Sequence, residues 1–461
     1  MMKFFYGIVI SLLFTSINDV KADILSATLA YNQGEYQTAY QEFQRLSLLG
    51  NKDAIYNVGV MFLYGQGVEK NLTHAYAWFL LAADFGLDEA RSAARLIEQE
   101  FDDPSILTAT YQLLQQGFSF ADFSKTLLPI FNEKQYSPKT EQPPLRLHSV
   151  NAKYPKAAYE KGLEGWVWLE FDVDELGTVK DVDIIDAFPS NTFNRAIYNA
   201  VRRWRYQPYQ IDGQVKPYSS RSLLYHFTTF KGKRYDASFS RQKRDYQKKI
   251  NQLIESAEQG NALVQYYIAN WLETDEHNAT RLLRFHWQNP TASSELLFSS
   301  AINGYPNSQY RLGANLLRGE YTDTDRKKGL KWILYAAQSG FVFAQYRLAR
   351  ELLDKRYVEY DPAKAKRWLV TAAKQGHFRA IRDLLALLIE TGDYQQAQYY
   401  LEQGLNHDAE HPDLLFSQGK LLFQQKAKKM AKTVLLKALK YAKQRHWYSE
   451  HISAYLQRHF S

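Results

Sequence analysis

Two histidines are the side chains whose types and spacing come nearest to a metal site. His407 and His411 lie four residues apart, so a helix would place both imidazoles on one face. Pro412 follows directly, however, and no third ligand is evident nearby. We therefore interpret the pair as structural and expect no bound metal.

A group of carboxylates is the second candidate for chemistry. Asp172, Asp174 and Glu175 cluster at an expected turn. A catalytic pair of carboxylates needs two different environments that separate the pKa values, and here we expect a solvated turn instead. The chain also has no cysteine and no GxxxxGK[ST], GxSxG or HExxH motif. We expect a protein that is not an enzyme and that has no cofactor.

Composition limits the class of protein. The 461 residues are 45% hydrophobic and 23% charged, which argues against wholesale disorder, and a single long apolar run excludes a polytopic membrane protein. Lys and Arg number 57 against 49 Asp and Glu, a formal charge of +8 that permits an anionic partner. Residues 420–445 hold nine Lys/Arg and no acid. This segment is either a solvated helix face or a surface that attracts anionic envelope polymers or lipid headgroups.

The N-terminus has the order of a targeting segment. Lys3 precedes an 11-residue apolar run, Phe4 to Phe14, and a polar stretch ends in Val20-Lys21-Ala22. This order predicts a signal peptide over residues 1–22 that is cleaved after Ala22. The alternative is an inner-membrane anchor formed by residues 4–14. A helix of that length rises only about 16 Å against a hydrocarbon core of about 30 Å, which favours cleavage. An exported chain is expected to have no nucleic-acid partner.

Three segments repeat one pattern, in which an alanine pair begins four residues after a Trp and a glycine lies eight residues after it. The copies are Trp78, Ala82, Ala83 and Gly86; Trp332, Ala336, Ala337 and Gly340; and Trp368, Ala372, Ala373 and Gly376. Small residues let helices approach closely, the Trp fills the space between them, and the glycine ends a helix in the left-handed conformation. The pattern predicts helix pairs that stack into an α-solenoid. These segments resemble Sel1-like repeats, relatives of the tetratricopeptide fold.

The middle of the chain has a different period. Residues 165–173 alternate between apolar and mixed positions, which predicts a strand with one buried side. A DELG turn at 174–177 and a return strand at about 178–186 follow. The apolar stripe from Phe193 to Trp204 predicts a helix packed on the sheet. With a short helix after Tyr154-Pro155 and a last strand from Ser222 to Phe230, we expect a three-stranded antiparallel sheet with two helices.

Residues 148–230 closely resemble the C-terminal domain of TonB, the energy transducer of Gram-negative outer-membrane import. The resemblance rests on Tyr154-Pro155, on Glu164-Gly165, on the D-x-x-G turn and on the RRWRYQP run at 202–208. It implies that a free sheet edge captures the TonB box, a short extended segment of an outer-membrane receptor, by strand addition. Tyr154-Pro155 has an equal alternative as a helix-entry device. The residues that the resemblance assigns to peptide binding are Asn151, Ala152, Lys153, Tyr154, Pro155, Leu223, Leu224, Tyr225, His226, Phe227, Thr228, Thr229 and Phe230.

The chain departs from that family in two respects. A transducer needs a membrane-spanning helix that meets its ExbB–ExbD motor and a long Pro-rich rod, whereas here the apolar run is short and the proline stretch is brief. We therefore expect a periplasmic adaptor that does not transduce force alone. Its expected partners are an outer-membrane TonB-dependent receptor or other envelope proteins, with an anionic envelope surface as a further candidate. The alternative function is a cell-envelope scaffold with no transport role.

The expected organisation is multi-domain, with an α-solenoid flanking a small α+β domain. The segments are a signal peptide (1–22), Sel1/tetratricopeptide-like repeats (23–130), a Pro-containing linker (131–147), the TonB C-terminal-like domain (148–232), Sel1-like repeats (245–404) and a basic tetratricopeptide-like helical C-terminus (405–461).

Overall fold

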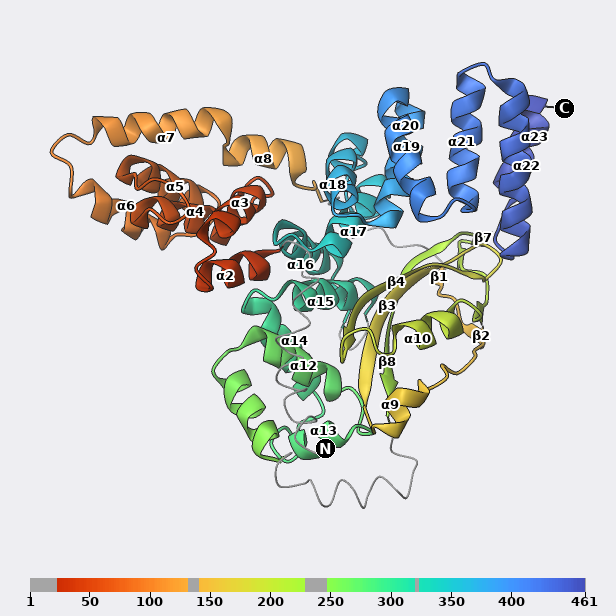
Figure 1. Ribbon diagram of the computed structural model, residues 1–461, viewed down its shortest axis with the longest axis horizontal. Coiled ribbons are helices and arrows are strands. Elements are labelled where there is room, and N and C mark those ends of the chain that lie inside the picture. Colours follow the sequence, from red (N-terminus) through yellow and green to blue (C-terminus); the bar gives the residue numbers. More distant parts are fainter. Residues whose placement is uncertain (1–22, 132–140, 229–246, 320–322, 461) are drawn as a thin grey trace. The chain divides into compact units, whose positions relative to one another are not determined.

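The computed structural model describes residues 23–131, 141–228, 247–319 and 323–460 (Figure 1). The predicted signal peptide lies outside these residues. The chain forms two compact units, and each is made from separate stretches of sequence. Of the described residues, the repeat unit comprises 23–131, 304–319 and 323–377, and the sheet unit comprises 141–228, 247–303 and 378–460. None of the helices in the described ranges combines the length and apolarity needed to cross a bilayer.

The repeat unit is entirely helical apart from its loops and an isolated bridge between Phe131 and Val358. Its helices are α2 (Ile24–Asn32), α3 (Tyr36–Ser47), α4 (Lys52–Tyr64), α5 (Leu72–Asp84), α6 (Ala90–Glu98), α7 (Ser105–Gly117), α8 (Phe120–Leu127), α15 (Pro306–Arg318), α16 (Arg326–Gln338), α17 (Val342–Leu353) and α18 (Pro362–Lys374). The predicted helix pairs are confirmed as α4–α5, α15–α16 and α17–α18.

The repeat glycines behave as predicted, whereas the tryptophans differ from one another. Gly86, Gly340 and Gly376 follow their helices with φ values of 91°, 93° and 77°, which confirms the left-handed helix ends. Trp368 is fully buried, but Trp78 and Trp332 are only partly buried. The Trp therefore fills the space between helices completely in one copy alone.

Two distant stretches of chain join side by side within the repeat unit. The Gln338 side-chain amide donates to the Gly50 carbonyl at 3.2 Å, and the Trp368 indole N–H donates to the Leu127 carbonyl at 3.0 Å. The N-terminal helices and the later repeats thus form one array, although the sequence between them belongs to the other unit.

The sheet unit contains the predicted antiparallel sheet. Its strands are β1 (Glu141–Gln142), β2 (Arg146–His148), β3 (Gly165–Val173), β4 (Val179–Phe188), β5 (Arg205–Tyr206), β6 (Gln210–Ile211), β7 (Gln214–Val215) and β8 (Tyr218–Phe227). The main sheet has the order β4-β3-β8, with both pairs antiparallel. The helices α9 (Lys156–Glu160) and α10 (Asn194–Val201) are the two that the sequence predicts, and Figure 1 shows them on one side of the strands.

The prediction that β3 has one buried side is wrong, because every residue of β3 is buried. On one face, Val167 and Leu169 share a core with Ile197 of α10 and with Phe193, which directly precedes that helix. On the other face, Trp166 packs against α12 (Ala262–Trp271), whose Tyr266 ring lies 5.8 Å away. Helices that come much later in the sequence therefore cover the face that the strand pattern assigns to solvent.

Those later helices complete the sheet unit. They are a helix over residues 247–258, α12, α13 (Asn278–Leu283), α14 (Ala292–Ile302), α19 (Phe378–Thr391), α20 (Tyr394–His407), α21 (Pro412–Gln424), α22 (Lys428–Gln444) and α23 (Glu450–Phe460). Residues 394–407 form the single helix α20, and residues 412–444 form the packed pair α21–α22.

Candidate peptide-binding edge

β8 is an edge strand with a regular stretch long enough to accept another strand. Its pairing with β3 runs without a break from Gly165 opposite Phe227 to Phe171 opposite Arg221. Within the described residues, β3 is the one strand that pairs with β8. Thr229 and Phe230, the last two residues predicted for the site, lie outside the described residues.

The side chains of β8 alternate between the two faces of the sheet. Leu223, Tyr225 and Phe227 pack on the core that α10 covers, and Leu224 lies opposite Trp168 in the β3 pairing. Leu223, Leu224 and Tyr225 are all half-buried, in contrast to the fully buried β3. This intermediate exposure is expected for a strand that has a neighbour on one side.

The second predicted segment lies next to β8. The Tyr154 ring is 5.7 Å from the Phe227 ring, so the two predicted segments come together at this point. Ala152 and Tyr154 pack on the core, whereas Asn151 and Lys153 are exposed. Asn151 and Lys153 are thus the members of this segment whose side chains reach the surface.

Tyr154 and Pro155 also have structural roles. The Tyr154 hydroxyl donates to the Leu163 carbonyl, and Pro155 is the N-cap residue of α9. The helix-entry interpretation of this pair therefore describes its local structure correctly.

The opposite edge strand, β4, is interrupted by bulges. Glu170 pairs with Asp183 and Asp172 pairs with Lys180, so one residue of β3 faces two residues of β4. Asp181 occupies the extra position with φ of 54°, a left-handed conformation that Asp tolerates better than most residues. A second shift in pairing lies between Trp168 and Leu169 of β3. Bulges twist an edge and disfavour pairing with a further strand.

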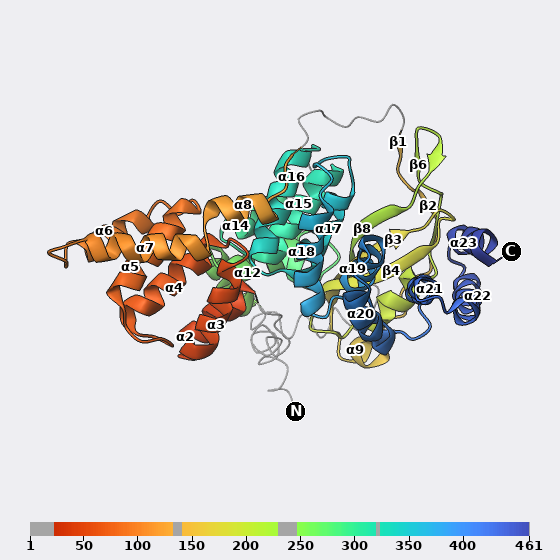
Figure 2. The ribbon, with the colours of Figure 1, turned by 90° about the horizontal axis from the view of Figure 1, so that it is seen from above.

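Buried and partly buried ion pairs join β4 to the C-terminal helices of the same unit, and Figure 2 shows α19 and α21 beside β4. Arg382 of α19 contacts the Asp181 carboxylate at 2.5 Å, and Lys180 contacts the Asp413 carboxylate of α21 at 3.0 Å. Asp181 is almost completely buried. The bulge at Asp181 therefore directs its carboxylate to a specific cationic partner.

Arg379 of α19 bridges two strands. Its guanidinium lies 2.6 Å from the Asp172 carboxylate of β3 and 3.1 Å from the Asp183 carboxylate of β4. The other oxygen of Asp172 accepts the backbone N–H of Ser220 in β8 at 2.7 Å. One carboxylate on the central strand thus contacts both α19 and the bulge in β8.

The charges in this cluster control one another's pKa values. Burial alone would raise the pKa of Asp181, but the charges of Arg382 and Lys180 outweigh burial and hold the pKa well below its ordinary value. The same opposition, with burial against Lys180 and Arg382, lowers the pKa of Asp413 to about 2. Burial opposes a charged Lys180, yet Asp413 and Asp181 raise its pKa. All three groups are therefore ionised near neutral pH.

The prediction of a solvated carboxylate turn is wrong. Asp172 and Asp174 are buried, and Glu175 is half-buried. Asp174 accepts backbone N–H groups from Thr178 at 2.8 Å and from Tyr448 at 2.8 Å. Burial raises the pKa of Asp174, and these N–H donors oppose the rise. The turn is thus held by the C-terminal segment and is not a free surface loop.

No pattern in the sequence indicates the arginines that bind these acids. Arg379 and Arg382 are separated from Asp172 and Asp181 by about two hundred residues, and no spacing rule connects them. The one sequence feature that could have suggested cationic partners is the number of aspartates on β3 and β4. That feature is ambiguous, because a strand with one solvated face would also be rich in aspartate.

The predicted histidine pair does not converge on a common point. The His407 ring stacks on Phe378 with centroids 4.5 Å apart, and His411 is buried with its Nε2 3.7 Å from Asp181. Across the described ranges, no group of three or more His, Cys, Asp and Glu side chains is placed to bind a metal ion.

A second pair of histidines lies at the end of β8. The ring nitrogens His226 Nδ1 and His277 Nε2 are 2.9 Å apart, and His277 precedes α13. Glu164 accepts the backbone N–H of Asn278 at 2.9 Å and its side-chain amide at 3.1 Å. The Glu164-Gly165 motif therefore also anchors the start of α13.

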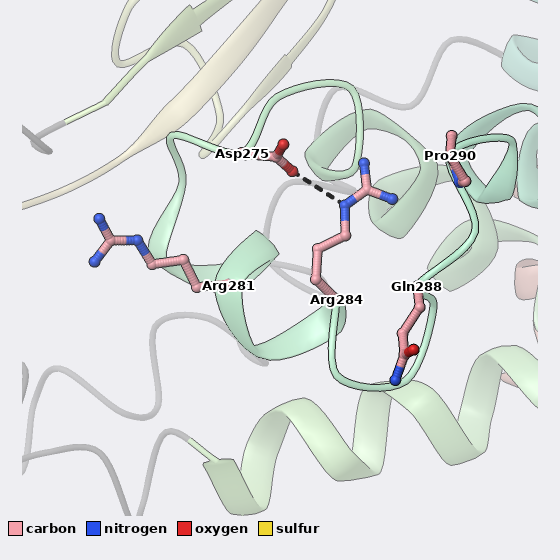
Figure 3. A pocket seen from close by; sticks show the side chains of 5 residues that line it. All are labelled: Asp275, Arg281, Arg284, Gln288 and Pro290. Carbon is pink, nitrogen blue, oxygen red and sulfur yellow. Dashed lines mark hydrogen bonds and ion pairs between the residues drawn. The ribbon is translucent and has the colours of Figure 1, made fainter.

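A shallow cavity of about 480 Å³ lies at the loops around α13, and Figure 3 shows the side chains that line it. Arg284 donates to the Asp275 carboxylate at 3.0 Å and to the carbonyls of Leu272 and Asn289 at 2.9 and 3.1 Å. The guanidinium is thus already used to hold two loops together. We assign no ligand to this cavity.

Comparisons with known families match the two predicted components. The family model described as Gram-negative bacterial TonB protein C-terminal matches residues 150–228. The Sel1 repeat model matches residues 52–86, 306–341 and 342–377. The first match covers β3, β4, α10 and β8, and the other three cover the helix pairs α4–α5, α15–α16 and α17–α18.

Individual relatives match over a short part of the chain. Protein TonB of Yersinia enterocolitica is 38% identical over 68 residues, which are 15% of this chain and 27% of that protein. Protein TonB of Escherichia coli is 43% identical over 65 residues, which are 14% of this chain and 27% of that protein. The chain thus spans about a quarter of the length of these relatives.

A solved structure matches more broadly but weakly. A protective antigen of uropathogenic Escherichia coli strains, which displays an SLR fold, aligns with 90% of this chain and 68% of its own at 19% identity and a TM-score of 0.33. The family matches are the more specific findings: residues 150–228 are a TonB C-terminal-type domain in a chain whose helical array contains Sel1 repeats.

Proposed function

We infer that this chain is a non-enzymatic periplasmic protein that binds an extended peptide at the β8 edge. The peptide belongs to an outer-membrane receptor in TonB-dependent transport, and the Sel1 repeats recruit further protein partners. The observation that carries this proposal is the regular, unbroken pairing of β8 from Arg221 to Phe227 at the edge of the TonB C-terminal-type sheet.

The contrast between the two edges supports β8 as the binding strand. β4 is bulged, and its charged side chains Lys180, Asp181 and Asp183 are engaged by α19 and α21. A regular edge offers backbone N–H and C=O groups in register to an incoming strand, and backbone bonding tolerates varied peptide sequences. Asn151 and Lys153 lie on the surface of the neighbouring segment, where their side chains can contact the peptide.

A cysteine cross-linking experiment tests the binding edge directly. The chain has no cysteine, so a single introduced thiol is unique. L223C and L224C place a thiol on β8, and I184C places one on β4 as the matched control. Each full-length variant is mixed with a synthetic TonB-box peptide that carries one cysteine, and disulfide-linked product is measured by mass.

The proposal expects cross-links with L223C and L224C and none with I184C. A peptide in which prolines replace alternate residues lacks the N–H groups for strand pairing and should lose the cross-link. Equal cross-linking at both edges, or none at β8, would refute edge-strand binding. Recovery of receptors from envelope extracts then tests the transport role separately, and failure to recover any receptor would reject it.

The proposed location has its own test. Residues 1–22 are proposed as a signal peptide cleaved after Ala22, on the strength of the sequence order alone. N-terminal sequencing of the protein from a periplasmic fraction should begin at Asp23. An intact N-terminus with membrane retention that resists high salt would instead support an anchor formed by residues 4–14.

One observation favours the alternative of an envelope scaffold. Both faces of β3 are buried within the sheet unit, so the sheet also stabilises the helices around it. A scaffold of this kind should remain folded and assembled in the L223C and L224C variants and should show no cross-link to the peptide. That pair of results would favour the scaffold over the transport adaptor.

A further inference from the structure

Helix α22 has two faces of opposite character. Ala431, Leu435, Ala438 and Ala442 are buried, and α22 packs with α21 and α23. On the other face six exposed lysines follow one another: Lys428, Lys429, Lys432, Lys437, Lys440 and Lys443. We call these residues the lysine face. The helix has 17 residues, so the face extends over about 25 Å.

Among the described residues, no carboxylate forms an ion pair with the lysine face. The sequence contains no acidic residue between Asp413 and Glu450. Within the part of the chain that the structure describes, Lys429, Lys440 and Lys443 form no ion pair. Like charges on one helix repel each other, and this repulsion is relieved only by salt or by an anionic partner.

Helix stability does not explain the lysines either. Lys428 and Lys429 lie in the first turn of α22, which holds no acidic residue. The N-terminus of a helix has a partial positive charge, so cations are unfavourable there. These two side chains therefore oppose the helix dipole, and their presence points to a role outside the fold.

Exposed apolar side chains lie among the lysines. Met430 is 62% exposed and Leu436 is 50% exposed. Leu436 is seven residues after Lys429 and four before Lys440, so all three share one face of the helix. The apolar face of α22 is packed inside the protein, so its outer surface offers a lipid headgroup layer clustered lysines and two exposed apolar side chains.

We propose that the lysine face of α22 docks on an anionic lipid bilayer. A bilayer is flat and extends over the full length of the face, and its headgroups attract lysines without fixed geometry. Lysine is a hydrated point charge, whereas arginine is the residue suited to bidentate recognition of carboxylates on a protein. Met430 and Leu436 gain apolar burial when they enter the headgroup region, and an acidic polypeptide would leave them in water.

Vesicle binding by the full chain tests the proposal. The variant K429Q/K440Q/K443Q removes three charges from the lysine face. The control K327Q/K331Q/K374Q removes three exposed lysines from α16 and α18. Each protein is titrated with vesicles of phosphatidylglycerol and phosphatidylcholine and with vesicles of phosphatidylcholine alone. Any binding through the apolar run at residues 4–14 is common to all proteins and cancels in the comparison.

We expect K429Q/K440Q/K443Q to bind the anionic vesicles roughly a hundredfold more weakly than the parent, since each lysine near such a surface contributes about a factor of five. The control variant should bind as the parent does, and rising salt should weaken the parent's binding. Thermal unfolding of K429Q/K440Q/K443Q should be unchanged or occur at higher temperature, because Lys429 opposes the helix dipole.

Three outcomes would overturn the proposal. They are unchanged anionic-vesicle binding in K429Q/K440Q/K443Q, an equal loss in the control variant, and equal binding of the parent to neutral and anionic vesicles. Binding of the parent to soluble poly-glutamate tests the alternative that the lysine face binds an acidic polypeptide. If the parent binds poly-glutamate but not the anionic vesicles, the partner is an acidic protein and the bilayer is rejected.

Discussion

Replacement of Arg379 by methionine should destabilise the sheet unit strongly. The Arg379 side chain is 3% exposed and contacts Asp172 and Asp183, which are 9% and 20% exposed. Methionine keeps much of the length and apolar volume but removes every donor. Two carboxylates then lose their cation, and breaking a buried ion pair in this way costs roughly 3–5 kcal/mol. That loss is a large fraction of the 5–15 kcal/mol, roughly, that stabilises an ordinary domain.

Urea unfolding and hydrogen exchange of β3 amides measure this loss. Global unfolding reports on both units, whereas exchange at residues 165–173 reports on the sheet unit alone. The control is R203M, because Arg203 is exposed on the same unit, and it should change stability by less than about 0.5 kcal/mol.

A double-mutant cycle identifies the interaction itself. In the D172N background R379M should cost less than in the parent, because the charge that Arg379 balances is already gone, and the coupling should be of the order of 2 kcal/mol. If R379M costs under about 1 kcal/mol, or if the two changes are additive, Arg379 does not hold the sheet and the reasoning fails.

Three further predictions concern the same unit. The pKa of Asp413 falls from 3.8 to about 2 on folding, so the ionised carboxylate stabilises the fold fully above about pH 4. Its contribution to the free energy of unfolding should decrease by roughly 2 kcal/mol between pH 5 and 2. Urea unfolding of D413N should show a smaller loss of stability over this pH range, and an equal loss would contradict the prediction. G177A should lower the free energy of unfolding by roughly 2–4 kcal/mol in the same assay, because Gly177 has φ of 78° and a Cβ would collide with the Tyr206 carbonyl. An unchanged free energy of unfolding would mean that the turn relaxes easily. Y154F loses the hydrogen bond to the Leu163 carbonyl and should lower the free energy of unfolding by about 1 kcal/mol. Peptide cross-linking at β8 should be retained. Loss of cross-linking without loss of stability would instead assign the Tyr154 hydroxyl to peptide contact.

Elements that depend on local sequence were predictable. The strand–turn–strand at 165–188 and the helix stripe ending near Trp204 follow from periodicity, and the repeat glycines follow from the conformation that ends a helix. The last strand begins at Tyr218, four residues before the predicted start, because a bulge near Ser220 interrupts its pattern. Local rules therefore find the strand but not its irregular end.

Burial of the second sheet face was not predictable in this way. Trp166, Trp168, Glu170 and Asp172 have the mixed polarity of a solvated face, yet all four are buried. Trp168 donates its indole N–H to the Ser222 hydroxyl at 2.8 Å, and Asp172 contacts an arginine about two hundred residues later. The partners of the polar side chains on such a face lie in distant segments, so they are known only from the folded structure. The bulge at Asp181 was not predictable for the same reason, because the Arg382 that contacts its carboxylate belongs to a distant segment.

The interleaving of the two units has a consequence for how the chain is made. Gly50 and Gln338, which share a hydrogen bond, are 288 residues apart. At about 5–20 residues per second, a ribosome needs roughly 15–60 s to synthesise the segment between them. The repeat unit closes only with residues 304–377, and the sheet unit closes only with residues 378–461. A chain that stops after residue 303 would therefore finish neither unit, so both units can close only after the last third of the protein has been synthesised.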